Sequence, residues 1–208
     1  MVSQRGFALI LSAPSGTGKS TLVRHIMTER DDVCASVSTT TRGPRPGEVH
    51  GKDYFFVTKE EFQAKIAAGD FLEWAEVFGN YYGTDRAFIE QKIHEGQVIL
   101  LDIDWQGARQ ITENLPKQDV VTAFVVPPSH DLLETRLRGR KSDSEEVIQK
   151  RMQAAAQEMS HWQEYDTIII NDDLEQAKKQ LLALVMAECL RRERMQDRIR
   201  PILDTFDL

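Results

Sequence analysis

The sequence predicts an α/β fold: a P-loop parallel sheet flanked by helices, with an inserted mixed α+β subdomain and a short helical lid. Three observations predict it. Continuous apolar runs alternate with segments of helical composition, which is typical of βαβ units. A glycine-rich loop joins the first run to the first helix, and a turn-rich, aromatic stretch interrupts the alternation. With 208 residues, 41% of them hydrophobic, the chain can bury the core of one domain.

The apolar runs have the pattern of strands that are buried on both faces of a parallel sheet. They comprise residues 7–11, 98–101, 122–126 and 167–170. The helical segments comprise residues 19–30, 107–114, 129–137, 145–164 and 174–198. Because other segments separate the runs, the predicted core is discontinuous in the sequence.

The interrupting stretch contains a turn-rich segment at 42–47 and several short strand candidates. These candidates are 54–57, 71–74 and 81–82. We interpret the stretch as an inserted mixed subdomain.

A second insertion surrounds the charged segment 138–144, and Ser142 with Glu145 forms a capping-box signature for the helix that follows. We interpret this part as a hinged, charged lid. The single domain of residues 1–208 therefore divides into a core at 1–35, 96–137 and 165–208, an insertion at 36–95 and a lid at 138–164.

Net charge and cysteine content exclude several classes of protein. The chain has 26 Lys and Arg against 33 Asp and Glu, and this charge of −7 disfavours a general nucleic-acid or membrane surface. Cys34 and Cys189 lie far apart without a CxxC pattern, which argues against a zinc site or a disulfide framework. Only about six apolar residues precede Pro14, too few for a signal core or a membrane span. We expect a cytoplasmic protein.

The glycine-rich loop has the composition of a phosphate-binding P-loop. It comprises Ala13, Pro14, Ser15, Gly16, Thr17, Gly18, Lys19, Ser20 and Thr21. Backbone N–H groups of such a loop surround a phosphate chain, and the following helix adds the positive end of its dipole. Lys19 would reach the β and γ phosphates, and the Ser20 hydroxyl would ligate Mg²⁺. The pattern asks for glycine at position 13, where alanine is the smallest replacement.

A second candidate Mg²⁺ ligand, Asp102, follows the strand at 98–101. In a doubly wound sheet the carboxyl ends of the strands face the ligand, so Asp102 could hold the Mg²⁺ shell directly or through water. Strands commonly end in aspartate, so this carboxylate is specific only together with the P-loop.

Two groups of arginines predict a second anion site and a lid over it. Arg42 and Arg45 flank a loop stiffened by prolines, which suits a second phosphate. Arg136, Arg140 and Arg151 bracket the second insertion and could close over a transferring phosphoryl group. The alternatives are a solvated turn and ordinary charges on helix surfaces. A phosphate acceptor is mostly dianionic near neutral pH and needs charge neutralisation rather than a strong base.

Five ordered stretches resemble the guanylate kinase family. They are residues 38–48, 51–56, 79–84, 101–107 and 170–173. The likeness runs from about Phe7 to the helix that begins at Leu174, and Ala13 is its one departure. The resemblance implies Mg²⁺-dependent transfer of the γ-phosphoryl group of ATP to GMP, in purine nucleotide metabolism. It also makes the insertion at 36–95 a GMP-binding subdomain.

The resemblance implies a role for each matching side chain on the acceptor side. Those that would hold the GMP phosphate are Arg42, Arg45, Tyr54 and Tyr82, and those that would face the guanine base are Ser38, Glu73, Thr84 and Asp104. Guanine has donors at N1 and N2 and an acceptor at O6, so carboxylates and hydroxyls complement it. Adenine would turn its N1 lone pair toward a carboxylate. From the residues alone, Glu73 and Thr84 could equally be ordinary polar strand residues.

On the donor side, the resemblance implies that the lid arginines embrace the donor phosphates and the transferring group. Together with Lys19 and Arg42 they would form the catalytic set. Asn171 would lie beside the donor base, although an asparagine before a helix is also simply a good cap.

Two other functions fit parts of the pattern. A guanylate-kinase-like scaffold domain would recognise phosphorylated partners, but it has no use for Lys19, Ser20 and the lid arginines. A kinase of another nucleoside monophosphate would need a base pocket without the pair of Glu73 and Asp104. We therefore expect the small-molecule nucleotides ATP, GMP and dGMP as ligands, and no nucleic acid or membrane. The charged segment 188–208 either mediates self-association into a homo-oligomer or frays.

Overall fold

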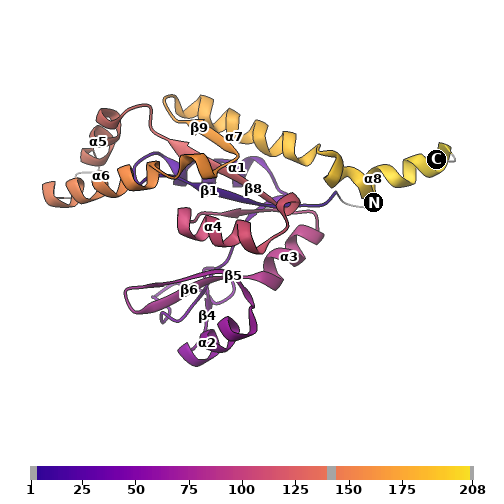
Figure 1. Ribbon diagram of the computed structural model, residues 1–208, viewed down its shortest axis with the longest axis horizontal. Coiled ribbons are helices and arrows are strands. Elements are labelled where there is room, and N and C mark those ends of the chain that lie inside the picture. The colour runs from indigo at the N-terminus through magenta and orange to yellow at the C-terminus, as the bar shows by residue number, and fades with distance from the viewer. Residues whose placement is uncertain (1–3, 140–143, 207–208) are drawn as a thin grey trace.

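The predicted α/β fold is confirmed. The computed structural model describes residues 4–139 and 144–206 and contains a five-stranded parallel sheet with a second, mixed sheet beside it (Figure 1). The strands of the parallel sheet, in spatial order, are β2 (Val33–Ala35), β7 (Val98–Leu101), β1 (Phe7–Ser12), β8 (Val120–Val126) and β9 (Thr167–Ile170). Its central strand, β1, pairs in parallel with β7 and β8, so the residue after β1 lies between two neighbouring strand ends.

The alternation of side chains along β1 divides the core into two layers. Leu9 and Leu11 pack with the helices on one face, α1 (Lys19–Glu29) and α7 (Leu174–Cys189). Ala8 and Ile10 pack with those on the other face, α3 (Arg86–His94) and α4 (Trp105–Asn114). Both faces are therefore covered, which explains why β1 is continuously apolar in sequence.

The second sheet belongs to the insertion and combines two strands of two residues with two longer ones. Its strands, in spatial order, are β4 (Phe55–Phe56), β3 (Thr39–Thr40), β6 (Asn80–Asp85) and β5 (Phe71–Val77). Only β3 and β4 are parallel, and β6 is antiparallel to both of its neighbours. β2, β3, α3 and α2 (Lys59–Ala68) were not among the predicted elements. The helix α2 buries a single residue, Phe62, and so shows little helical periodicity in sequence.

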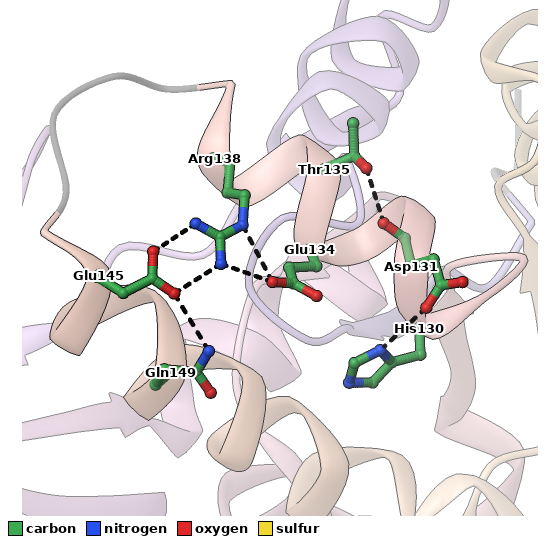
Figure 2. A network of polar contacts seen from close by, with 7 residues as sticks. All are labelled: His130, Asp131, Glu134, Thr135, Arg138, Glu145 and Gln149. Carbon is green, nitrogen blue, oxygen red and sulfur yellow. Dashed lines mark hydrogen bonds and ion pairs between the residues drawn. The ribbon is translucent and has the colours of Figure 1, made fainter.

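Two helices, α5 (His130–Arg138) and α6 (Glu145–Met159), form a lobe at one end of the molecule (Figure 1). They share a small apolar cluster that includes Leu137 and Met152. Arg138 links them: its Nη2 lies 2.7 Å from Glu134 Oε1 and 2.6 Å from Glu145 Oε1, and its Nη1 contacts the other oxygen of Glu145 (Figure 2). The bonds that Glu145 accepts from Arg138 and, to a smaller extent, from Gln149 lower the pKa of Glu145 to about 2.

Two of the predicted helices end elsewhere. The predicted helix 145–164 ends at Met159 and is followed by a short 3₁₀ turn, η2 (Trp162–Glu164). Its N-cap is Ser144, whose hydroxyl accepts from Val147 N, whereas the predicted cap Ser142 lies outside the described residues.

The predicted helix 174–198 is two helices, α7 and α8 (Arg192–Leu203), with an extended residue, Arg191, between them. The break lets the buried Arg194 reach the start of β1, where its Nη1 donates to Gly6 O at 3.2 Å and its guanidinium lies 4.2 Å from the Phe7 ring centroid. Two more 3₁₀ turns are η1 (Lys117–Asp119) and η3 (Asp204–Phe206). Within 4–139 and 144–206, no helix is both long enough and apolar enough to serve as a membrane span.

Candidate active site

The P-loop joins β1 to α1 and forms a cleft of about 470 Å³. Gly16 and Gly18 have φ angles of 95° and 97°, the left-handed region that glycine tolerates best. Lys19 is the first residue of α1, so the unpaired N–H groups of the helix and its positive dipole end face the cleft. Sequence alone predicted this loop, and the fold places it at the carboxyl end of the central strand.

Hydrogen bonds beneath the loop fix its shape. The buried Thr17 donates through Oγ1 to Pro14 O at 2.8 Å. Asn171, which follows β9, donates through Nδ2 to Thr17 O at 2.5 Å and is itself only 3% exposed. The loop is therefore bonded to the far edge strand of the sheet, a contact between residues 154 positions apart.

Lys19 and Asp102 meet across neighbouring strand ends. Lys19 Nζ lies 2.5 Å from Asp102 Oδ1. Asp102 follows β7, the neighbour of β1, so both groups stand at the same edge of the sheet. Ser20 also lines the cleft and is exposed. The structure thus pairs a cation with a carboxylate beside the cleft that Ser20 lines, and the roles of the three residues toward ATP and Mg²⁺ stay predictions.

Glu73 and Thr84 pair across the second sheet. They occupy opposed positions of β5 and β6, and Thr84 Oγ1 donates to Glu73 Oε1 at 2.6 Å. Burial raises the pKa of Glu73, and the nearby charge of Asp104 raises it further, against the opposing effect of the Thr84 hydroxyl. A side chain at Gly107 would place its Cβ 3.6 Å from Glu73 Oε2, in van der Waals contact with it. The result is a carboxylate held in a fixed orientation with one oxygen available to a ligand.

Helix α4 connects this carboxylate to the core. Asp104 is its N-cap, and one oxygen of Asp104 accepts from Gln106 N and Gly107 N at 3.0 and 2.9 Å. Gln110, further along the helix, bonds both the N–H and the carbonyl of Trp74, the neighbour of Glu73. Because α4 also begins just after β7, it joins the second sheet to the edge that carries Asp102.

Arg42 lies among aromatic rings and carries its own counter-charge. Its guanidinium donates to both carboxylate oxygens of Glu48, at 3.0 and 2.8 Å, which raises the pKa of Arg42. It also lies 5.2 Å from the Tyr54 ring centroid, and the Tyr54 and Tyr82 rings are 6.2 Å apart. Arg45 is tied to the same group because its backbone N donates to Glu48 Oε2 at 2.7 Å. The side chains of Arg42, Tyr54 and Tyr82 thus lie together, and the backbone of Arg45 is bonded to the carboxylate that pairs with Arg42.

Ser38 is the least connected of the residues expected at the guanine base. It is half-buried just before β3, and its backbone carbonyl accepts from Phe55 N at 2.9 Å. This bond belongs to the sheet and does not involve the Ser38 hydroxyl. The role of that hydroxyl at the guanine base therefore stays a prediction.

The three predicted lid arginines have different settings. Arg136, on α5, donates through Nη2 to the carbonyl of Asn171 at 2.9 Å, which brings it to the P-loop side. Arg151 lies half-buried on α6. Arg140 lies outside the described residues. Arg138, two residues from Arg136, is instead engaged by Glu134 and Glu145 (Figure 2), so it holds the two helices together.

Comparison with known proteins shows the family of the chain. A family model described as guanylate kinase matches residues 5–188. The chain belongs to the guanylate kinase family. It is 50% identical over 196 residues to the guanylate kinase of Cereibacter sphaeroides, covering 94% of this chain and 93% of that protein.

Two further comparisons agree. The chain is 51% identical over 205 residues to the guanylate kinase of Vibrio parahaemolyticus, covering 97% of this chain and 98% of that one. The crystal structure of guanylate kinase from Anaplasma phagocytophilum matches with a TM-score of 0.67 and 38% identity, covering 93% of this chain and 92% of that chain. The resemblance predicted from five short stretches is therefore confirmed.

Two charged residues that line the P-loop cleft were not predicted from the sequence. They are Arg24 on α1 and Glu158 on α6. Burial raises the pKa of Glu158, whereas the nearby Lys19 lowers it and Asp104 raises it. Glu158 lies seven residues after Arg151, two turns along the predicted helix, so helical spacing could have placed both on one face. The charges of Lys19 and Asp104 thus act on the pKa of one carboxylate.

A second cavity, of about 350 Å³, lies where β8 and β9 begin, at the edge of the sheet opposite the P-loop. Its charged lining residues are Lys117, Arg191, Arg194, Asp166, Glu188 and Glu193. The charges balance, and Glu188 pairs with both Arg191 and Arg194, at 2.9 and 3.4 Å. A triphosphate requires an excess of cationic donors, so this cavity does not compete with the P-loop cleft as a nucleotide site.

Proposed function

We propose that this protein transfers the γ-phosphoryl group of ATP to GMP, producing ADP and GDP in purine nucleotide metabolism. One observation carries the proposal. Helix α4 joins the pair of Glu73 and Thr84, which is complementary to guanine, to the sheet edge where Lys19 meets Asp102. A phosphate oxygen of GMP forms the new bond to the γ-phosphorus, and the bond from that phosphorus to the β–γ bridging oxygen breaks. The bridging oxygen leaves on ADP, so neither step needs a strong protein base.

The donor site consists of the P-loop and the arginines of the lid. Residues Ala13 to Thr21 would surround the phosphates of ATP, with Lys19 at the β and γ phosphates. Arg136, Arg140 and Arg151 would neutralise the charge of the transferring group, and Asn171 would complete the ATP site. Catalysis would come from positioning and electrostatic stabilisation, and closure of the lid would exclude water that could hydrolyse ATP.

The acceptor site lies on the second sheet. The phosphate of GMP would bind Arg42, Arg45, Tyr54 and Tyr82, while Ser38, Glu73, Thr84 and Asp104 would bind the base. The existing bond from Thr84 to Glu73 supports this role, because it leaves Glu73 Oε2 free for the N1 and N2 donors of guanine. None of the eight residues is assigned to the ribose, so we propose dGMP as a second acceptor.

Mg²⁺ fits the oxygen donors at the strand edge, Ser20 and Asp102. Among the described residues no group of three or more His, Cys, Asp or Glu side chains could hold a metal. A nucleotide-bound Mg²⁺ needs only one or two protein oxygens, since phosphates and water supply the rest. When bound, it would neutralise charge on the β and γ phosphates. Asp102 already faces Lys19, so the carboxylate also orients the lysine toward the cleft.

We further propose the cytoplasm as the compartment, because Cys34 and Cys189 are both free thiols. The functional parts would be the core at 1–35, 96–137 and 165–208, the GMP-binding insertion at 36–95 and the lid at 138–164. Self-association into a homo-oligomer would use the segment 188–208, where Ile199, Ile202 and Phe206 on α8 and η3 are exposed.

A coupled assay of ADP release tests the proposed reaction. The purified protein is supplied with ATP and Mg²⁺ and with GMP, AMP, UMP or no acceptor. We expect turnover with GMP and little with the other three. Equal rates with AMP, or ADP release that does not require an acceptor, would contradict the proposal.

A further inference from the structure

Asn171 lies beneath the P-loop, and its side chain is bonded to that loop. Its backbone N donates to Val126 O at 2.9 Å and so extends the pairing of β9 with β8 by one residue. Its Nδ2 donates to Thr17 O at 2.5 Å, and the two residues are 3% and 0% exposed. Because both groups are buried, neither has water as an alternative partner if the bond is lost.

This bond fixes the direction of one peptide group of the P-loop. In a trans peptide the C=O and N–H bonds point to opposite sides, and the described backbone contains no cis peptide. Asn171 holds the Thr17 carbonyl on the buried side, so the N–H of Gly18 is directed to the other side, toward the cleft that Gly18 lines. That N–H is one of the donors that such a loop offers to phosphate.

Gly18 has the conformation that this contact requires. Its φ is 97°, and a Cβ added there would lie 2.5 Å from Asn171 Nδ2, closer than real Cβ contacts. Any side chain at position 18 would therefore displace the amide of Asn171. The absence of a side chain at Gly18 thus lets Asn171 approach the loop on its buried side and leaves room for a phosphate on the cleft side.

The backbone of Asn171 serves the lid side at the same time. Arg136 Nη2 donates to the Asn171 carbonyl at 2.9 Å. We propose that Asn171 is a positioning residue: its amide aims the Gly18 N–H at the donor phosphates, and its carbonyl holds Arg136 toward them. This inference rests on the proposed donor site and gives Asn171 a role through the loop rather than through the donor base.

The two possible roles of Asn171 make different demands on the donor. Nδ2 is already bonded, and Oδ1 has no hydrogen-bond partner among residues 4–139 and 144–206. A base contact through Oδ1 would favour a base with an amino group, so its loss would weaken ATP but not ITP. A positioning role would affect every polyphosphate alike, including one that has no base.

The test compares Asn171→Leu, which keeps the size of the side chain without the amide, with the smaller Asn171→Ser. The matched control is Asp172→Asn, at the neighbouring exposed position. Calorimetric titration with ATP, ITP and inorganic tripolyphosphate gives the dissociation constants, and steady-state kinetics gives KM for GMP. We expect all three dissociation constants to rise by a similar factor, on the order of tenfold, with KM for GMP unchanged and Asp172→Asn like the parent protein.

Three results would overturn the inference. The first is weaker binding of ATP with unchanged binding of ITP and tripolyphosphate, which would assign Asn171 to the base. The second is unchanged binding of all three by both variants. The third is a parallel rise in KM for GMP together with a lower unfolding temperature, which would indicate a general structural role. Turnover by the parent protein and by Asp172→Asn tests the proposed reaction separately, so the two failures are distinguishable.

Discussion

The proposed donor and acceptor sides of the site are held in different ways. The P-loop follows the fully buried strand β1, and the Thr17 and Asn171 groups that hold it are themselves buried. Three of the proposed acceptor residues, Glu73, Tyr82 and Thr84, lie on β5 and β6, and exposure increases along β5 from the buried Phe71 to the exposed Val77. Buried strands and a buried hydrogen bond hold the proposed donor site, whereas polar pairs such as Arg42 with Glu48 and Glu73 with Thr84 hold the proposed acceptor site.

Those pairs show what a ligand meets on each side. Arg42 is already bonded to Glu48, and Glu73 to Thr84, so the acceptor groups keep their orientation before GMP arrives. A phosphate at Arg42 must share the guanidinium with Glu48. On the proposed donor side, Lys19 faces Asp102, and all the P-loop residues from Ala13 to Thr21 except Thr17 line the cleft. We therefore expect donor-side changes to affect catalysis most and acceptor-side changes to affect affinity and specificity.

The largest expected effect is that of Lys19→Ala on the donor side. The ammonium group would stabilise the negative charge on the phosphoryl group as it is transferred. Without it, kcat should fall by about 100-fold or more. GMP binding, measured by calorimetry without ATP, should be unchanged. The control is Lys179→Ala, an exposed lysine on α7. Turnover that survives Lys19→Ala would refute the assignment of the donor site.

The next effect is that of Arg45→Ala on the acceptor side. Loss of a charged donor to the GMP phosphate should raise KM for GMP by about tenfold, with the affinity for ATP nearly unchanged. Lys52→Ala, on the same exposed loop, is the control. If the affinity for ATP fell and KM for GMP did not rise, Arg45 would belong to the donor site instead.

A pH-dependent effect should follow from Glu73. Its pKa is raised by burial, so the carboxylate gains a proton, and loses its capacity to accept from guanine, as the pH falls through this raised value. KM for GMP should therefore rise at acidic pH. Glu73→Gln should weaken GMP by about tenfold at neutral pH and lack this rise. An identical pH profile in both proteins would exclude Glu73 as its source.

The smallest expected effect is that of Glu73→Gln on stability. This substitution should weaken GMP binding but stabilise the folded protein at neutral pH. Because the pKa of Glu73 lies above its ordinary value of 4.5 in the folded protein, the native state binds this proton more tightly than the unfolded chain. Its ionisation therefore lowers stability as the pH rises from about 4.5 through the raised pKa. Glu73→Gln should increase Tm at neutral pH and change it little at about pH 4. Glu76→Gln, exposed on the same strand, is the control for scanning calorimetry.

The parallel sheet was predictable from the sequence, whereas much of the insertion was not. The run at 98–101 is β7 to the residue, because a strand buried on both faces leaves an unbroken apolar signal. The run at 167–170 is β9 to the residue, but the prediction that it is buried on both faces was wrong: β9 is an edge strand, and Ile168 and Ile170 are exposed. In the insertion, β3 has two residues and α2 buries only Phe62, so neither leaves a usable period. The break between α7 and α8 depends on Arg194 reaching Gly6, a contact that no local pattern encodes.

The sequence by itself predicted the chemistry that we propose: a P-loop with Lys19 and Ser20, two arginine groups and, through the family resemblance, a set of carboxylates and hydroxyls suited to guanine. Backbone conformation and residue type are local properties, so these features could be predicted from short stretches. Only the tertiary structure decided which polar groups act together. It directed Arg138 to Glu145 and Arg136 to the Asn171 carbonyl, and placed the Asn171 amide under Thr17. Those pairings arise from sheet order and helix packing, which bring together residues far apart in the chain.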